Sequence, residues 1–212
     1  MSGVIYWGLW FLFRVLACLL FRFRIDRVQV FPKTGGVIVA ANHASYLDIP
    51  LLGCAIRRRV CFIGRANLFP NRFLSWVLQR LGWIPLKTNR LDRKAFGVAL
   101  AHLKSGTPVV IFPEGSRTED GQLQPGRPGI GYLVEESQCQ VIPAYISGTF
   151  KVLPVRAKRP RLLPVSVSFG ESVRFPKGEP INKKQEYEKI GRTVMDHIAQ
   201  VGGLSTPPND FL

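Results

Sequence analysis

The sequence has few acidic side chains and few cysteines, and both shortages narrow the classes of protein to which it can belong. Only 14 Asp and Glu residues stand against 29 Lys and Arg residues, so the formal net charge is +15 at pH 7. This excess of positive charge predicts an anionic partner, which could be a nucleic acid, an anionic membrane or a phosphorylated substrate. The four cysteines include no Cys-x-x-C pair. We therefore expect no zinc or other metal site, and reduced, buried thiols in a cytosolic protein.

Several other signals are also missing from the chain. It contains no internal repeat, no low-complexity tract and no RNA- or DNA-binding signature. No Gly-x-Ser-x-Gly turn is present, so a covalent acyl-serine intermediate has no support in the sequence. At 212 residues and 46% hydrophobic content, the chain predicts one folded domain with a substantial core rather than a disordered protein.

Residues 4–21 are almost wholly apolar, and a basic cluster follows them at Arg22, Arg24 and Arg27. A secretory signal is disfavoured because no basic segment precedes the apolar run and because Arg14 interrupts it. The same objections apply to the faint likeness of residues 15–18 to a lipoprotein cleavage site.

Three interpretations of this apolar segment remain: a membrane span, a helix in the membrane interface, and a soluble core helix. About 20 apolar residues can span a bilayer, but Arg14 would be costly at mid-membrane unless its side chain snorkelled to the surface. Trp7 and Trp10 suit the headgroup level, and the arginines suit anionic lipid. We favour membrane attachment through residues 1–27, interfacial ahead of spanning. The positive charge after the helix predicts the cytoplasmic face of a membrane, such as a bacterial inner membrane.

Strands and helices alternate along the rest of the chain. This alternation predicts an α/β fold of a single domain, with a mixed, mostly parallel central sheet flanked by helices. The folded domain is expected over residues 28–203 and a loose tail over 204–212. We expect strands at 28–31, 37–41, 60–63, 83–86, 107–112, 141–146 and 165–169, and helices ending near 56 and covering about 71–81, 92–104, 129–137 and 183–200.

An Asn-His pair follows the second expected strand directly. His43 lies in the turn after residues 37–41, and Asp48 lies near the start of the next helix. In open α/β sheets, ligands bind at the carboxyl ends of the strands. A carboxylate at this spacing can fold back onto one imidazole nitrogen and leave the other free to take a proton as a general base. The alternative is an ordinary turn histidine beside a capping box formed by Ser45 and Asp48.

A second apolar strand, residues 109–112, runs into a turn that carries a charged pair. If this strand is parallel to the first, Glu114 and Arg117 emerge at the same edge as His43. Gly115 allows the backbone to approach a ligand closely, and the planar guanidinium of Arg117 matches a phosphate. Taken alone, the turn is equally typical of a solvated loop with a local ion pair.

The order Asn42-His43-x4-Asp48, then Phe112-Pro113-Glu114-Gly115-Ser116-Arg117, then Val141-Ile142-Pro143-Ala144 resembles the glycerolipid acyltransferases, most closely the bacterial 1-acyl-sn-glycerol-3-phosphate acyltransferases. The resemblance covers about residues 28–175. It implies that His43, held by Asp48, deprotonates the 2-hydroxyl of lysophosphatidic acid, which then attacks an acyl thioester to give phosphatidic acid. It also implies that the acyl donor is acyl-ACP or acyl-CoA, that no cofactor is needed, and that Glu114, Gly115, Ser116 and Arg117 hold the glycerol phosphate.

One block of the family pattern departs in this chain. In Gly82-Trp83-Ile84-Pro85-Leu86-Lys87-Thr88, the threonine stands where the family has a second phosphate-binding arginine. Lys87, Arg90 or Arg127 could supply the missing charge, although Arg90 fits a surface charge equally well. This departure leaves an acyltransferase with a different lysolipid acceptor as the main alternative.

The composition agrees with an enzyme that works at a lipid surface, because a basic domain tied to a membrane suits anionic amphiphilic substrates. The basic runs Arg57–Arg59 and Arg156–Arg161 fit contact with a bilayer, with solvated loops as the alternative. Two hypotheses from other classes remain. The net charge favours a nucleic-acid-binding protein, although no such partner is expected beside an apolar anchor, and a catalytically silent membrane-surface module would share that anchor.

Overall fold

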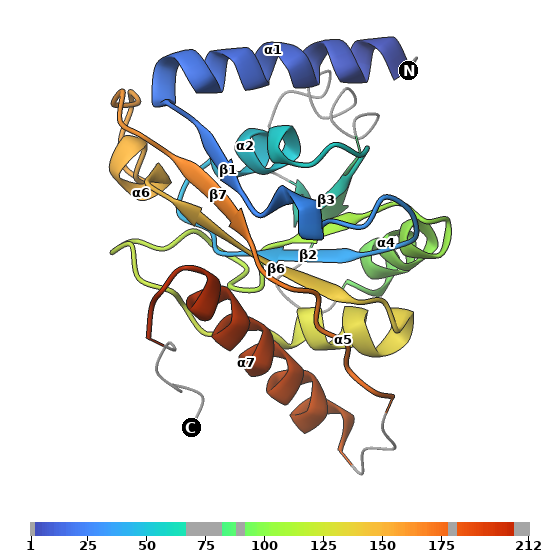
Figure 1. The fold of residues 1–212 in the computed structure, drawn as a ribbon. Coiled ribbons are helices and arrows are strands. Elements are labelled where there is room, and N and C mark those ends of the chain that lie inside the picture. The colour runs from blue at the N-terminus through green and yellow to red at the C-terminus, as the bar shows by residue number, and fades with distance from the viewer. Residues whose placement is uncertain (1–2, 67–81, 88–91, 178–181, 206–212) are drawn as a thin grey trace.

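The computed structural model describes residues 3–66, 82–87, 92–177 and 182–205, and these residues form an α/β domain (Figure 1). The described strands are β1 (Arg24–Asp26), β2 (Ile38–Ala41), β3 (Cys61–Arg65), β4 (Trp83–Leu86), β5 (Val109–Ile111), β6 (Val141–Ser147) and β7 (Ser166–Phe169). The described helices are α1 (Gly3–Phe21), α2 (Asp48–Ala55), α4 (Arg93–Lys104), α5 (Pro128–Ser137), α6 (Thr149–Val152) and α7 (Lys183–Val201), with a 3-10 turn at Val28–Val30.

The strands form one sheet in the order β1-β7-β6-β2-β5-β3-β4. Every neighbouring pair is parallel except β6 and β7, so the predicted mixed, mostly parallel sheet is confirmed. Strand β2 lies at the centre between β5 and β6, with Ile38 level with both Val109 and Val141. The carboxyl ends of these three parallel strands therefore lie at one edge of the sheet.

Helices cover both faces of the sheet, with α1 and α2 on one face and α4, α5 and α7 on the other (Figure 1). Side chains alternate along β2, so Val39 and Ala41 enter the core under α1 and α2, whereas Ile38 and Ala40 enter the opposite core. All four residues are completely buried. Burial on both faces explains why β2 reads as a continuous apolar run rather than as an alternating pattern.

Helix α1 packs against α2 through polar contacts as well as apolar ones. Trp10 Nε1 donates to the Ile56 carbonyl at 3.0 Å, and Arg14 Nη1 donates to the Cys54 carbonyl, also at 3.0 Å. The Cys54 carbonyl lies in the last turn of α2, where carbonyls lack partners within the helix and carry partial negative charge. Arg14 interrupts the apolar run because it faces the protein and completes this helix end.

The opposite side of α1 exposes large apolar side chains, among them Val4, Phe11, Leu12, Leu16 and Leu19. In the described part of the chain, no helix combines the length and hydropathy that a membrane span requires.

The strand expected at residues 28–31 is wrong. Residues 28–30 form a 3-10 turn, and the edge strand is instead Arg24–Asp26, which pairs with β7. Arg27 between them has a φ of 56°, in the left-handed region, and this residue turns the chain out of the sheet. The short helix α6 was also not expected, and the helix expected over about 71–81 lies outside the described residues. The other strands and helices agree with the expected positions to within a few residues.

The cysteines agree with the expectation only in part. All four are free thiols; Cys54 and Cys61 are buried, but Cys18 is exposed and Cys139 is half-buried. Burial raises the pKa of the Cys54 and Cys61 thiols to about 11. These two cysteines act as small apolar core residues.

Candidate active site

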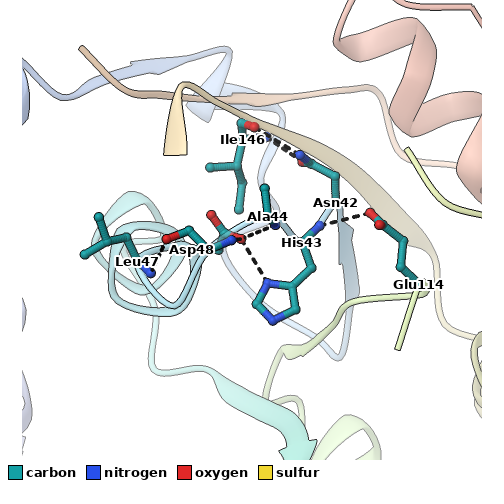
Figure 2. Close-up of polar contacts among 8 residues, drawn as sticks. Asn42, His43, Ala44, Leu47, Asp48, Glu114 and Ile146 are labelled. Atoms are coloured by element: carbon teal, nitrogen blue, oxygen red, sulfur yellow. Dashed lines mark hydrogen bonds and ion pairs between the residues drawn. The ribbon is translucent and has the colours of Figure 1, made fainter. Parts of the chain in front are cut away.

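The turn after β2 brings an imidazole and a buried carboxylate together (Figure 2). His43 Nδ1 donates to Asp48 Oδ2 at 2.9 Å, and the same oxygen accepts the backbone N–H groups of Ala44 at 2.7 Å and Ser45 at 2.8 Å. The Asp48 side chain is completely buried, whereas that of His43 is 14% exposed. This arrangement places the imidazole proton on Nδ1 and leaves Nε2 free to accept another.

The capping alternative and the catalytic interpretation describe the same carboxylate. Asp48 is the first residue of α2 and accepts the Ser45 backbone N–H, as the acidic residue of a capping box does. The Ser45 hydroxyl accepts the backbone N–H of Leu47 at 3.2 Å. Asp48 therefore closes the turn and holds the imidazole at once, so the helix start fixes the position of His43.

Two neighbouring strands hold this turn from either side. The imidazole of His43 stacks on the ring of Phe112 at the end of β5, with 4.1 Å between ring centroids and 16° between planes. On the other side, the Asn42 amide donates to the Ile146 carbonyl at 3.0 Å and accepts the Ile146 N–H at 2.7 Å (Figure 2). Asn42 thus continues the pairing of β2 with β6 beyond the end of the strand.

Glu114 lies almost completely buried beside His43. Its Oε1 accepts the backbone N–H of His43 at 3.0 Å, and the His43 carbonyl accepts the N–H of Thr118 at 2.9 Å. Burial raises the pKa of the Glu114 carboxyl to about 8, although the hydrogen bond from His43 partly opposes this shift. Burial therefore favours the neutral form of this side chain near pH 7.

Arg117 lies beside the same turn. Its guanidinium carbon is 3.5 Å from the centroid of the Tyr46 ring, and Tyr46 lies between His43 and Asp48 in the sequence. Within the described residues, the guanidinium makes no hydrogen bond or ion pair. The Tyr46 ring orients the cation from one face and leaves its N–H donors available to a ligand. Ser116, next to it, is half-buried.

Gly115 and Arg127 make a close contact that explains the glycine. Gly115 has a φ of +70°, and a Cβ atom there would lie 2.6 Å from Cδ of Arg127. Arg127 crosses this position because its Nε donates to the Glu114 carbonyl at 3.0 Å. A second cation is therefore held against the Glu114–Arg117 turn, and its binding of a head group stays a prediction.

Lys87 is not brought to this crevice. It follows β4, three strand spacings from β2, which corresponds to about 14 Å across the sheet. Lys87 instead lines a cavity of about 690 Å³ along β4, together with Arg59 and Lys94. His43 is not among the described residues that line this cavity. Arg90, the other candidate cation, and Thr88 lie outside the described residues.

Sequence reasoning assigned no role to Asn42, Phe112 or Tyr46, although each directly adjoins a residue that it singled out. The parallel pairing of β2 with β5 was the available signal, because it predicts that residues just past both strand ends meet. Which side chains stack on which follows from the strand register, and periodicity does not determine that register.

The family model described as Acyltransferase matches residues 22–147, more than half of the chain, and this range includes both turns. The chain belongs to the acyltransferase family.

Relatives of this acyltransferase-family chain include the chloroplastic 1-acyl-sn-glycerol-3-phosphate acyltransferase BAT2 of Brassica napus, 31% identical over 55% of this chain and 34% of the relative. The lyso-ornithine lipid O-acyltransferase of Pseudomonas aeruginosa is 29% identical over 54% of this chain and 43% of the relative. A crystal structure of the 1-acyl-sn-glycerophosphate acyltransferase of Thermotoga maritima shares the fold, with a TM-score of 0.72 at 24% identity over 90% of this chain and 78% of that one. The alignments with the first three curated relatives span 34%, 38% and 52% of their lengths.

The raised pKa of Glu114 predicts how pH affects the stability of the fold. In the unfolded chain this carboxyl ionises above its ordinary pKa of 4.5, whereas in the folded protein it stays protonated up to about 8. Its contribution to stability is therefore complete below pH 4.5 and is lost as the pH rises toward 8, by up to about 1.4 kcal/mol per pH unit. Glu114→Gln keeps an acceptor for the His43 N–H and removes the titration.

Denaturant unfolding of wild type and Glu114→Gln across this pH range measures the effect. As the pH rises, we expect the free energy of unfolding of Glu114→Gln to increase relative to that of wild type. A difference that stays constant with pH would contradict a buried, neutral Glu114.

Proposed function

We propose that the protein is a membrane-associated acyltransferase that moves a fatty acyl group from a thioester to the 2-hydroxyl of 1-acyl-sn-glycerol 3-phosphate, giving phosphatidic acid. One observation carries this proposal. His43 is bound through Nδ1 to Asp48, and the turn after the adjacent parallel strand brings Arg117 to the same sheet edge. A general base and a phosphate-binding cation beside each other match an acceptor that joins a hydroxyl to a phosphate.

The reaction follows from the free imidazole nitrogen. His43 Nε2 accepts the proton of the acceptor hydroxyl as its oxygen attacks the thioester carbonyl carbon. The negative charge of Asp48 stabilises the imidazolium that forms. The tetrahedral intermediate then expels the thiolate, which takes the proton back from His43. General-base catalysis contributes about 10²–10⁴-fold, and holding both substrates in place contributes further to the rate.

Direct transfer suits this site better than an acyl-enzyme intermediate. A thioester is already activated, so the acceptor oxygen can attack it without a protein nucleophile. Ser45, the serine next to the dyad, is completely buried, and its oxygen accepts the Leu47 N–H. The donor is a substrate, carried on acyl carrier protein or coenzyme A, and no cofactor takes part in the proposed steps.

The phosphate of the acceptor is bound by Arg117, with Ser116, the Gly115 backbone and Arg127 beside it. The carboxyl group of Glu114 is buried and accepts the His43 backbone N–H. We assign Glu114 to positioning the base. Its neutral form also avoids repulsion of the phosphate.

Membrane attachment belongs to the same proposal. The outward side of α1 presents large apolar side chains, and the chain carries a net charge of +15. An apolar helix in the interface, with cations around it, binds anionic lipid bilayers. Lying there, the enzyme can meet an acceptor whose acyl chain stays in the bilayer.

A different lysolipid acceptor is the second candidate. The relative from Pseudomonas aeruginosa is named a lyso-ornithine lipid O-acyltransferase, at an identity close to that of the lysophosphatidic acid enzymes. Thr88 also replaces the second phosphate-binding arginine of the family pattern. The same base would serve either acceptor, so the two candidates differ only in the group that Arg117 binds.

His43→Ala should lower kcat by at least about 10²-fold, because it removes the base and leaves only the binding groups. Asp48→Asn should lose about as much, because an amide N–H facing Nδ1 favours the tautomer with its proton on Nε2. Acyl transfer from labelled thioesters to a panel of lysophospholipids measures both effects.

Vesicle binding and circular dichroism of the same variants should match wild type. An inert wild type that still bound anionic vesicles would instead support a catalytically silent membrane module. Salt-sensitive oligonucleotide binding without acyl transfer would support a nucleic-acid-binding protein.

Arg117→Ala should raise the acceptor KM by about 10- to 100-fold, since it removes charge-assisted hydrogen bonds to the phosphate. Arg117→Lys should recover part of this loss as a point charge without the planar fork. Both effects should be confined to acceptors that bear a phosphate monoester. Equal effects on zwitterionic lysolipids, or a wild type that prefers them, would favour the second candidate.

A further inference from the structure

The connection between α6 and β7, residues 153–165, carries four basic side chains and no acidic one. We call it the basic-leucine loop. Its two adjacent leucines are exposed to solvent, Leu162 at 68% and Leu163 at 38%. Exposed leucines beside unopposed cations are unusual on a solvated loop, and together they match a surface that is both apolar and anionic. The basic side chains are Arg156, Lys158, Arg159 and Arg161.

Backbone hydrogen bonds fix the end of this loop beside the carboxyl end of α1. The Val165 N–H donates to the Phe21 carbonyl at 3.0 Å, and the Arg24 N–H donates to the Val165 carbonyl at 3.1 Å. Leu19, in the last turn of α1, is 75% exposed. Figure 1 shows the orange loop after α6 rising beside this end of α1. The loop therefore extends the apolar surface of α1 to a second segment.

The loop is held in shape before any partner binds. The Arg161 N–H donates to the Val152 carbonyl at 2.8 Å, which closes the loop onto the end of α6. Three prolines, at positions 154, 160 and 164, restrict the backbone further. Ordering the loop on a partner therefore costs little conformational entropy.

The charges on the loop are mostly unopposed. Arg156 meets Glu119 at 3.5 Å, and both side chains are largely exposed. Within the described residues, Lys158, Arg159 and Arg161 make no ion pair. Three cationic side chains next to two exposed leucines are thus available to bind a partner.

We propose that the basic-leucine loop is a second membrane contact, which binds anionic headgroups beside α1 while its leucines enter the interface. This inference deepens the proposed function and rests on its membrane attachment through α1. A nucleic acid or an acidic protein would satisfy the cations, but neither would explain why the leucines face outward next to the apolar side of α1. An anionic bilayer would bind the cations and would also accommodate the exposed leucines.

A second contact has a mechanical consequence. A single helix lying in the interface leaves the domain free to roll about the helix axis. The loop lies off that axis and connects α6 to β7. Strand β7 pairs with β6, and Ile146 of β6 holds Asn42 next to His43. Contact at the loop therefore fixes the orientation of the His43 crevice relative to the lipid surface.

The test compares the full-length protein with a variant that carries Lys158→Gln, Arg159→Gln and Arg161→Gln. Cosedimentation with vesicles of equal parts phosphatidylcholine and phosphatidylglycerol, at about 0.1 M salt, measures binding without any acyl transfer. We expect the variant to bind at least about 10-fold more weakly than wild type. On vesicles of phosphatidylcholine alone, the two proteins should bind alike.

A matched control removes three charges from the opposite face of the sheet. Lys183→Gln, Lys189→Gln and Arg192→Gln change exposed residues of α7, which packs on the core away from α1. This control should bind both vesicles as wild type does, apart from the small effect of net charge. Leu162→Ser with Leu163→Ser should weaken binding to both kinds of vesicle.

The outcomes separate this inference from the proposed function. If the loop variant binds anionic vesicles as tightly as the α7 control, the loop is not a membrane contact, whatever the acyl transfer activity. Unchanged vesicle binding with a raised KM for an acyl carrier protein donor would assign the loop to an acidic protein and overturn the inference. Loss of vesicle binding with full transfer to an acceptor in neutral detergent micelles is the expected pattern.

Discussion

The site depends on one buried carboxylate oxygen. Asp48 Oδ2 accepts an imidazole N–H and two backbone N–H groups from the turn that precedes its own helix. A completely buried charge of this kind requires hydrogen-bond donors, and the turn between β2 and α2 supplies three of them to Oδ2, although Oδ1 has no partner. The local fold and the orientation of His43 therefore cannot change independently. A substitution that removes this oxygen as an acceptor also removes the hydrogen bonds that it makes to the Ala44 and Ser45 backbone N–H groups of the turn.

The second constraint is the parallel alignment of β2 with β5. It brings the Glu114 carboxyl group to the His43 N–H, the Phe112 ring under the imidazole, and Arg117 beside Tyr46. Three residues about 70 positions later in the sequence thus complete the surroundings of His43. Burial favours the neutral form of Glu114, so this carboxyl group does not offset the positive charge of Arg117. In the proposed function, the apolar side of α1 and the basic-leucine loop place this crevice beside a lipid surface.

Much of the fold could be predicted because its central strands are buried on both faces. Residues 37–41, 109–112 and 141–146 are short apolar runs that end in polar turns, and this pattern is typical of strands that are buried on both faces. Edge strand β1 could not be found this way, since Arg24-Ile25-Asp26 has charged residues around a single apolar one. The Val28–Val30 segment alternates like a strand, but the left-handed conformation of Arg27 directs it out of the sheet.

The sequence predicted which two turns form the site, but it did not predict how the side chains of one turn pack against the other. The spacing of His43 and Asp48 predicted their contact, and the two strand ends predicted that Arg117 would lie near them. The direction of Glu114 was not predictable, because a carboxyl group in a turn usually faces solvent and only the packing of the strands buries this one. Lys87 had the right charge, but its strand lies at the far edge of the sheet.

The most direct test of the central claim is the tautomer of His43, measured by ¹⁵N NMR of the imidazole nitrogens in the folded protein. The chain has three histidines, and the spectrum of His43→Gln assigns the relevant signals. We predict a hydrogen-bonded Nδ1–H resonance that disappears in Asp48→Asn, and an unprotonated Nε2 in the neutral imidazole. A neutral His43 with its proton on Nε2, or an Nδ1–H resonance that Asp48→Asn leaves unchanged, would contradict this prediction.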